Sequence, residues 1–158
     1  MNAGGGAAPR LEQFFRGRLH AYGLFRDRFG RPRQRFEMAV DAALDQNCLT
    51  LAERIRYDHG QTEERTWRIT SLEDGGYRAT ADGVLGQARA VVDGAFLRWR
   101  YTFGIVIGGR TLHVRVDDWM SQPNERILIS CAVVSKLRVR IGDMTITFVK
   151  DAKLDHPA

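Results

Sequence analysis

The sequence predicts an all-β protein, an antiparallel up-and-down barrel of about eight to ten strands. Apolar and polar residues alternate with a period of two along most of the chain, as in strands that bury one face. Turns containing Gly, Asp or Asn separate these alternating segments, which is typical of strands joined by short hairpins. No convincing helix of about ten residues or more is present, and no βαβ spacing occurs.

The two ends of the chain are predicted to be tails around a single barrel domain. Residues 1–10 are rich in Gly and Ala, which predicts a flexible N-terminal tail. This segment lacks an apolar h-region, so it predicts no signal peptide and a cytoplasmic location. LEQFF then predicts a short helical turn at the start of the barrel domain, residues 11–150, and 151–158 predict a second tail.

The strands follow from the alternation between successive turns. In the first of them Gly17, Leu19, Ala21, Gly23 and Phe25 share one face, and glycines in a strand mark curvature or close approach of the backbone. The turns are FGRP, AALDQ, DHGQ, EDGG, DGVLG, DG, GG, QPN and a short Leu/Arg break. The strands between them are predicted at 18–27, 34–42, 47–57, 63–71, 76–82, 86–92, 95–107, 110–120, 126–135 and 138–149. Ten strands joined in this way can leave no free edge if the sheet closes on itself.

The stretch WRYTFGIVIGGRTLHVRVDDWM predicts a hairpin with a defined register. A type I′ turn needs positive φ at both central residues, and Gly108 and Gly109 meet that need. With these two residues as the loop, Trp99 lies opposite Asp118 on the inner face, next to Tyr101 and Met120.

The outer face of the same hairpin carries the other aspartate of VDDWM. Arg100 is predicted to lie opposite Asp117 as an ion pair, and Arg98 to lie over Trp119 as a cation–π contact. Neighbouring residues of a strand point to opposite faces, so Asp117 and Asp118 cannot act as one acid–base pair or chelate one ion.

Asp118 needs a partner, because burying an isolated charge is costly. With a three-residue loop at His59–Gln61, Glu53 lies opposite Trp67 on the apolar face, and Arg65 lies diagonally beside Glu53. On the outside, the same loop places Arg56 opposite Glu64. The sequence therefore predicts an internal polar group of Glu53, Arg65 and Asp118, with Arg65 as the partner of Asp118 and with Tyr57 and Tyr101 nearby.

This polar group has three interpretations. It is a buried ion-pair network that fixes barrel closure, a set of groups that holds the polar end of a ligand, or a catalytic centre. The candidate ligand-binding residues of the lumen are Asp118, Arg65, Glu53, Trp99, Tyr101, Tyr57, Trp67 and Met120.

Composition and motifs exclude several classes of function. Residues 1–35 hold eight Arg against Glu12 and Asp27, while the remainder is close to neutral, so the net charge of +5 comes mainly from RDRFGRPRQR and the residues before it. A solvated turn is the simpler interpretation of this segment, and no nucleic-acid partner is predicted. No apolar run approaches the roughly 18 residues of a membrane span. The Cys and His residues lack zinc-ligand spacing, and no nucleotide-binding or GxSxG motif occurs, so no metal, cofactor or catalytic residue is predicted.

Several motifs resemble a bacterial family of lipocalin-like proteins called domain of unknown function 3833. They are FFRGRLHAYGLFRDRFG, RYDHG, RTWRI, LRWRY, VDDWM and VSK with IGDMTITF, over about residues 12–150. The resemblance implies a calycin-like barrel. It also implies exported lipoproteins among related sequences, so the alternative to a cytoplasmic location is a periplasmic or membrane-anchored one if the start is misplaced. The chain departs from the family pattern at Gly83, Ser121, Ser130–Cys131 and Leu137–Arg138.

Three functions are compatible with these observations. The favoured one is a non-enzymatic barrel that binds a small hydrophobic or amphipathic molecule in its lumen. The second is an enzyme acting on a similar molecule, with Asp118 or Glu53 as base and a Tyr as proton donor. The third is a solidly packed barrel with a structural or partner-binding role, to which an interior of less than a few tens of Å³ would point. The sequence leaves the ligand and the oligomeric state open.

Overall fold

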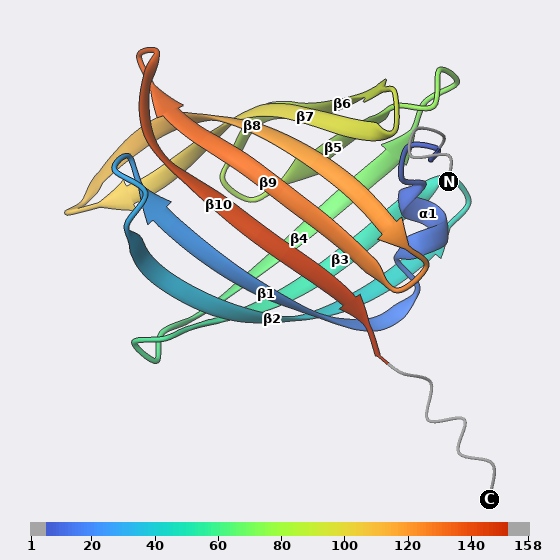
Figure 1. The fold of residues 1–158 in the computed structure, drawn as a ribbon, viewed down its shortest axis with the longest axis horizontal. Coiled ribbons are helices and arrows are strands. Elements are labelled where there is room, and N and C mark those ends of the chain that lie inside the picture. Colours follow the sequence, from blue (N-terminus) through green and yellow to red (C-terminus); the bar gives the residue numbers. More distant parts are fainter. Residues whose placement is uncertain (1–5, 152–158) are drawn as a thin grey trace, which may run out of the picture.

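The computed structural model describes residues 6–151, which form a closed antiparallel β-barrel with a short helix at one end (Figure 1). Helix α1 is Leu11–Phe14, and the strands are β1 (Gly17–Asp27), β2 (Pro32–Asp45), β3 (Cys48–Tyr57), β4 (Thr62–Ser71), β5 (Tyr77–Ala81), β6 (Val84–Asp93), β7 (Phe96–Ile107), β8 (Arg110–Asn124), β9 (Ile127–Lys136) and β10 (Val139–Lys150). Residues 1–5 and 152–158 of the predicted tails lie outside the described residues. In the described part of the N-terminal tail, Pro9 is buried and Ala8 packs against the core. No helix within residues 6–151 is long and apolar enough to cross a membrane.

The up-and-down topology predicted from the sequence is confirmed. Each strand pairs with the next along the chain, and β1 pairs with β10, so the sheet has no free edge. All ten predicted strands are present. The largest differences are at β2, which continues to Asp45 and turns at Gln46–Asn47, and at β8, which continues through Pro123 to Asn124. Gln46 takes a φ of 57°, so a tight turn fits where the sequence suggested a longer one.

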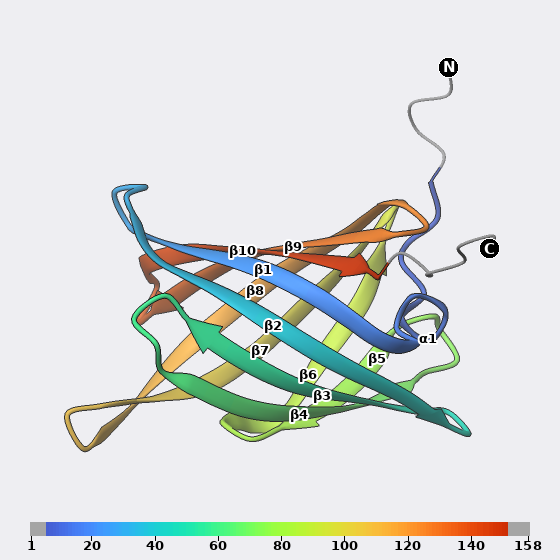
Figure 2. The same cartoon turned by 90° about the horizontal axis from the view of Figure 1, so that it is seen from below.

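The barrel has two different ends (Figures 1 and 2). The loop end carries the connections β1–β2, β3–β4, β5–β6, β7–β8 and β9–β10. The helix end carries the other four connections together with α1. These two names are kept below.

Helix α1 closes the helix end because its apolar side chains point into the barrel. Leu11, Phe14 and Phe15 are each only 1% exposed. The Phe15 ring makes edge-to-face contacts with Phe14 at 5.1 Å and with Phe148 of β10 at 5.2 Å between ring centroids. Four residues cannot form a stable helix alone, so tertiary packing of these side chains holds α1 in place.

A tyrosine hydroxyl ties α1 to the wall. Tyr77 Oη of β5 accepts a hydrogen bond from the backbone N–H of Leu11 at 3.0 Å and donates one to Glu12 Oε2 at 2.6 Å. Burial is the first cause that raises the pKa of Tyr77, and the bond to Glu12 adds to it. The hydroxyl therefore stays protonated and keeps both bonds.

Replacing Tyr77 by Phe is expected to lower the free energy of unfolding by about 1–3 kcal/mol, because the buried N–H of Leu11 loses its acceptor. Urea unfolding at neutral pH measures this loss. Tyr22→Phe, which removes a hydroxyl from a side chain exposed on the outer face, is the matched control and should change stability by less than about 0.5 kcal/mol. Equal effects of the two variants would show that the Tyr77 hydroxyl does not hold α1.

The β7–β8 register is as predicted from the Gly-Gly turn. Trp99 pairs with Asp118, Arg100 with Asp117, and Ile107 with Arg110. Both turn glycines have positive φ, 56° for Gly108 and 77° for Gly109, as a type I′ turn requires.

The predicted β3–β4 register is wrong by two residues. Glu53 pairs with Arg65 rather than with Trp67, and the predicted pairing of Arg56 with Glu64 does not form. The loop is Asp58–Gly60, because Tyr57 N donates to Gln61 O and Gly60 N donates to Tyr57 O, each at 2.9 Å. In such a three-residue loop the last position needs positive φ, and Gly60 supplies it with a φ of 93°. A register shift of two residues leaves every side chain on the same face of the sheet, so the inward residues of both strands remain inward.

Gly23 of β1 leaves space for an aromatic ring rather than for a ligand. A Cβ atom on Gly23 would lie 2.0 Å from Phe36 Cζ of the neighbouring strand β2. The Phe36 ring therefore covers Gly23 from inside, which explains the need for glycine at this position.

Candidate functional site

The barrel encloses a cavity of about 220 Å³. This is larger than the roughly 150 Å³ apolar cavity that accommodates benzene and close to the lower limit, about 300 Å³, of drug-sized ligand pockets. The interior is therefore not packed solid. The cavity is lined by Leu11, Phe15, Phe25, Gln34, Phe36, Met38, Leu51, Glu53, Ile55, Tyr57, Arg65, Trp67, Ile69, Trp99, Tyr101, Asp118, Met120, Ser130, Met144, Ile146 and Phe148.

The cavity runs from the α1 plug towards the loop end. At the helix end its wall is formed by Leu11 and Phe15, which are fully buried. Towards the loop end the lining residues Gln34, Tyr57 and Arg65 are only partly buried. The cavity thus approaches solvent at the loop end.

All eight candidate residues chosen from the sequence lie on the wall of this one cavity. Alternation alone placed them inside, because each lies on the same face of its strand as apolar core residues. Their contacts with one another differ from those expected, as the following paragraphs describe.

Glu53, like Asp118, is a buried carboxyl group of the cavity wall. Its side chain is 8% exposed on β3, opposite Arg65 of β4. Burial raises the pKa of Glu53 to about 7, while the positive charge of Arg65 and hydrogen bonding by the Trp67 side chain oppose this rise. Near neutral pH this group can therefore hold or release a proton inside the cavity.

Arg65 contacts Glu63 and not Asp118, so the predicted Arg65–Asp118 ion pair is wrong. Arg65 Nη2 donates to Glu63 Oε1 at 2.7 Å, and its guanidinium lies 4.7 Å from the centroid of the Phe103 ring. Tyr57 Oη donates to the other oxygen of Glu63 at 2.6 Å. Glu63 thus joins Tyr57 and Arg65 near the loop end.

The partner of Asp118 is Ser130 of β9. Ser130 Oγ donates to Asp118 Oδ1 at 2.6 Å, and both side chains are buried. Burial raises the pKa of Asp118 to about 6, the bond from Ser130 lowers it, and the nearby charge of Asp117 raises it. The Ser130 hydroxyl on the adjacent strand reaches the Asp118 carboxyl group, whereas the Arg65 guanidinium is bound by Glu63 of its own strand.

Sequence reasoning missed both Glu63 and Ser130. Each shares the inward face of its strand with a residue that is plainly in the core: Glu63 with Arg65 and Trp67, Ser130 with Leu128. Applying the alternation to every polar residue of the predicted strands would have found them.

Replacing Ser130 by Ala is expected to destabilise the protein by about 1.5–3 kcal/mol at pH 8, where Asp118 is ionised and loses a hydrogen bond to a charged group. At pH 4.5 the folded protein holds Asp118 protonated, and the loss should be about 1 kcal/mol. Urea unfolding at the two pH values measures the difference. A loss that is the same at both would contradict a bond to the ionised carboxylate.

Trp99 brings an unpaired donor to the wall. Its side chain is 4% exposed and stacks at 6.3 Å on Tyr77. Trp99 Nε1 is buried and has no hydrogen-bond acceptor among residues 6–151. A buried donor without a partner costs about 1–3 kcal/mol, so this indole N–H is, among the described residues, an unsatisfied polar group within a residue of the cavity wall.

Asp117 belongs to the outer face, as predicted. It lies 4.0 Å from Arg100, but its main partner is Arg98, which donates to both carboxylate oxygens at 2.9 and 2.6 Å. The Arg98 guanidinium also lies 4.7 Å from the Trp119 ring centroid, as the register predicted. The hydrogen bonds from Arg98 are the first cause that lowers the pKa of Asp117. The two adjacent aspartates therefore have opposite environments and opposite pKa shifts.

Groups of three or more His, Cys, Asp or Glu residues that could hold a metal ion are absent from the part of the chain that the structure describes. Of the acidic residues in and beside the cavity wall, Glu63 is bonded by Tyr57 and Arg65, and Asp118 by Ser130. Burial raises the pKa values of Glu53 and Asp118.

Solved structures are similar to this chain to different degrees. The S-type phycobiliprotein lyase CPES from Guillardia theta aligns with a TM-score of 0.64 and 7% identity, over 91% of this chain and 94% of that chain. EF1p2_mFAP2b, in a structure bound to DFHBI, aligns with a TM-score of 0.47 and 11% identity, over 89% and 97% of the two chains. The ywiB protein from Bacillus subtilis aligns with a TM-score of 0.42 and 16% identity, over 85% and 91%. The first of these likenesses shows a lipocalin-like barrel.

At the level of sequence, a comparison with curated proteins gives no match. The family model described as "Protein of unknown function (DUF3833)" matches residues 4–150, which includes every strand of the barrel and the whole cavity wall. The chain therefore belongs to the DUF3833 family.

Proposed function

We propose that the barrel binds a small, mainly apolar molecule with one polar end in its central cavity. The observation that carries this proposal is the cavity of about 220 Å³, whose wall is mostly aromatic and aliphatic and includes a few polar groups. Such a wall is the usual form of a small-molecule site, in which apolar surface supplies affinity and polar groups fix orientation.

The polar groups define the chemistry of the ligand's polar end. Trp99 Nε1 and the Arg65 guanidinium are donors, so an oxygen acceptor suits them. Glu53 and Asp118 have raised pKa values, so a hydroxyl or neutral polar group is accommodated better than a second carboxylate next to them. An aromatic or aliphatic alcohol of about ten heavy atoms fits both the volume and the polarity.

Binding of 2-naphthol and naphthalene to the intact protein tests this proposal. We expect 2-naphthol to bind with a Kd of about 1–100 µM, which corresponds to roughly 0.5–0.7 kcal/mol per heavy atom. Naphthalene, which lacks the hydroxyl, should bind several-fold more weakly. Isothermal titration calorimetry measures both affinities, and native mass spectrometry of protein taken from cells shows whether a molecule co-purifies.

A matched pair of Trp substitutions locates the site. Met144 lines the cavity, whereas Val133 lies on the outer face of the neighbouring strand and is 38% exposed. Met144→Trp should fill the cavity and abolish 2-naphthol binding, and Val133→Trp should leave it unchanged. Equal binding to both variants would place 2-naphthol outside the barrel, and chemical conversion of a co-purified molecule by the protein would favour an enzyme over a binding protein.

A further inference from the structure

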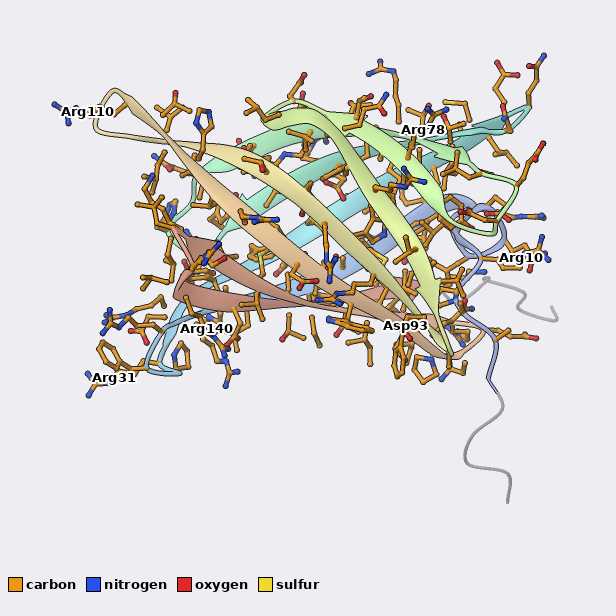
Figure 3. The ribbon with its side chains drawn as sticks, turned by 90° about the horizontal axis from the view of Figure 1, so that it is seen from above. Arg10, Arg31, Arg78, Asp93, Arg110 and Arg140 are labelled. Atoms are coloured by element: carbon orange, nitrogen blue, oxygen red, sulfur yellow. The ribbon has the colours of Figure 1, made fainter. Side chains whose placement is uncertain are left out.

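The charge of the chain is distributed unevenly along the barrel axis. Counted with two residues on either side of each turn, the five connections of the loop end hold nine Arg or Lys and four Asp or Glu residues. The four connections of the helix end hold two and five. Figure 3 shows Arg31, Arg110 and Arg140 together at the loop end, away from Arg10 at the helix end. The loop end is therefore basic, with a net charge of +5. The helix end is close to neutral, because α1 and its flanks add Arg10, Arg16 and Arg18 against Glu12.

Ion pairs neutralise some of the basic residues of the loop end, but five of the nine form none in the described part of the chain. Asp143 pairs with Arg26 at 2.8 Å and with Arg140 at 2.5 Å, and Asp27 pairs with Arg33 at 2.7 Å. The basic residues of the loop end that form no ion pair within residues 6–151 are Arg28, Arg31, Arg110, Lys136 and Arg138.

Large apolar side chains project from the same loops. Phe29 is 74% exposed in the β1–β2 loop, Val106 is 72% exposed beside the β7–β8 turn, and Leu137 is 85% exposed in the β9–β10 turn. These side chains make little contact with the barrel, and each lies within a few residues of an arginine. The combination of exposed apolar tips with neighbouring arginines is typical of segments that insert at a membrane interface.

The β9–β10 turn holds its apolar tip in an unfavourable backbone conformation. Leu137 has a φ of 50° and Arg138 a φ of 66°, the left-handed region that favours Asn and Gly in two-residue hairpin turns. Folding gains nothing from Leu and Arg at these positions. Their side chains instead place an apolar and a basic group at the outermost point of the loop end.

We propose that the loop end docks on an anionic membrane surface, with Phe29, Val106 and Leu137 entering the interface and the arginines contacting lipid headgroups. The helix end lacks this excess of basic charge and carries α1 instead of the apolar tips, so the barrel axis would stand roughly along the membrane normal. The cavity approaches solvent at this same end, near Gln34, Tyr57 and Arg65. Docking in this orientation would bring the mouth of the cavity to the lipid.

A bilayer fits this surface better than a nucleic acid or an acidic protein segment. A polyanion would be satisfied by the arginines alone and would leave Phe29, Val106 and Leu137 in water. Insertion of these tips removes apolar surface from water at the same time as the arginines meet anionic headgroups. A surface that is anionic outside and apolar just beneath would contact both the arginines and the apolar tips, and a soluble polyanion would not.

Vesicle flotation with the full chain tests the proposal. We expect binding to vesicles of phosphatidylcholine containing about 30 mol% phosphatidylglycerol, little binding to phosphatidylcholine alone, and partial loss of binding in high salt. The double variant Leu137→Asn/Arg138→Gly should lower the partition coefficient at least roughly 30-fold, and its Tm should stay equal or rise because the turn becomes more favourable. This separates loss of docking from loss of folding.

The matched control changes the same kinds of residue away from the loop end. Leu44 is 47% exposed at the end of β2, and Arg78 is exposed on β5 at the other side of the molecule from the loop tips. Leu44→Asn/Arg78→Ser should leave the partition coefficient within about twofold of the wild type, because these positions stay in water. Unchanged flotation of Leu137→Asn/Arg138→Gly, or an equal loss in the control, would overturn the proposal. Binding of soluble polyphosphate as tight as that of anionic vesicles would also overturn it in favour of a polyanion partner. None of these outcomes depends on whether the cavity binds 2-naphthol.

Discussion

Replacing Phe15 by Ala is expected to lower the free energy of unfolding by about 3–5 kcal/mol. Phe15 is 1% exposed and lies edge-to-face between Phe14 of α1 and Phe148 of β10, so the truncation removes a buried ring and leaves a void at the helix end. For a protein of this size the loss corresponds to a Tm lower by roughly 10–15 °C. Thermal and urea unfolding measure it.

The same truncation should enlarge the ligand cavity, because Phe15 forms part of its wall. We expect 4-phenylphenol, which is longer than 2-naphthol by about two carbon atoms, to raise the Tm of the Phe15→Ala variant by more than that of the wild type. Leu128→Ala is the control. Leu128 is fully buried beside Phe148 but does not line the cavity, so its truncation should destabilise without improving the response to 4-phenylphenol. An equal response in both variants would mean that the α1 plug does not bound the binding site.

The fold could be predicted from the sequence because its signals are local. A closed up-and-down barrel is made entirely of hairpins between consecutive strands, and each hairpin is specified by its own alternation and turn. The Gly108–Gly109 turn gave the full β7–β8 register, since both positions require positive φ. The β3–β4 register was wrong by two because the loop was placed one residue too late. Recognising Gly60 as the last residue of the loop would have corrected it.

The residues of the candidate site could be predicted from the sequence, but the contacts between their side chains could not. Which residues face the lumen depends only on parity along a strand, and a register error of two leaves parity unchanged. Which side chains touch depends on barrel closure and on rotamers. Asp118 is bonded by Ser130 of the next strand, and Arg65 is held by Glu63 of its own strand. A pattern of alternation contains no information about these choices.

Wild-type stability is expected to fall as pH rises from about 5 to 8, and Glu53→Gln is expected to remove the part of that fall above pH 6. The unfolded chain releases the Glu53 proton near pH 4.5, whereas the folded protein holds it until about pH 7. Between these values the folded state binds more protons than the unfolded state, so stability decreases as pH rises. A rise of this size amounts to on the order of 3 kcal/mol once Glu53 is fully ionised. Gln is neutral at every pH, so the variant should be the more stable protein at pH 8 and close to the wild type at pH 4.5.

Urea unfolding at pH 5, 6, 7 and 8 separates Glu53 from the other carboxyl groups. Burial raises the pKa of Asp118 only to about 6, so its contribution is complete before the upper part of the range. The pKa of Asp117 is lowered; its stabilisation is present above its unfolded pKa and is lost only in acid, so Asp117→Asn should leave the decline between pH 6 and 8 intact. A decline in Glu53→Gln as steep as in the wild type would rule out Glu53 as its source. A profile that is flat above pH 6 in Glu53→Gln alone would show that one buried carboxyl group of the cavity wall takes up a proton near neutral pH. A bound hydroxyl would meet this group as a hydrogen-bond donor or acceptor according to pH.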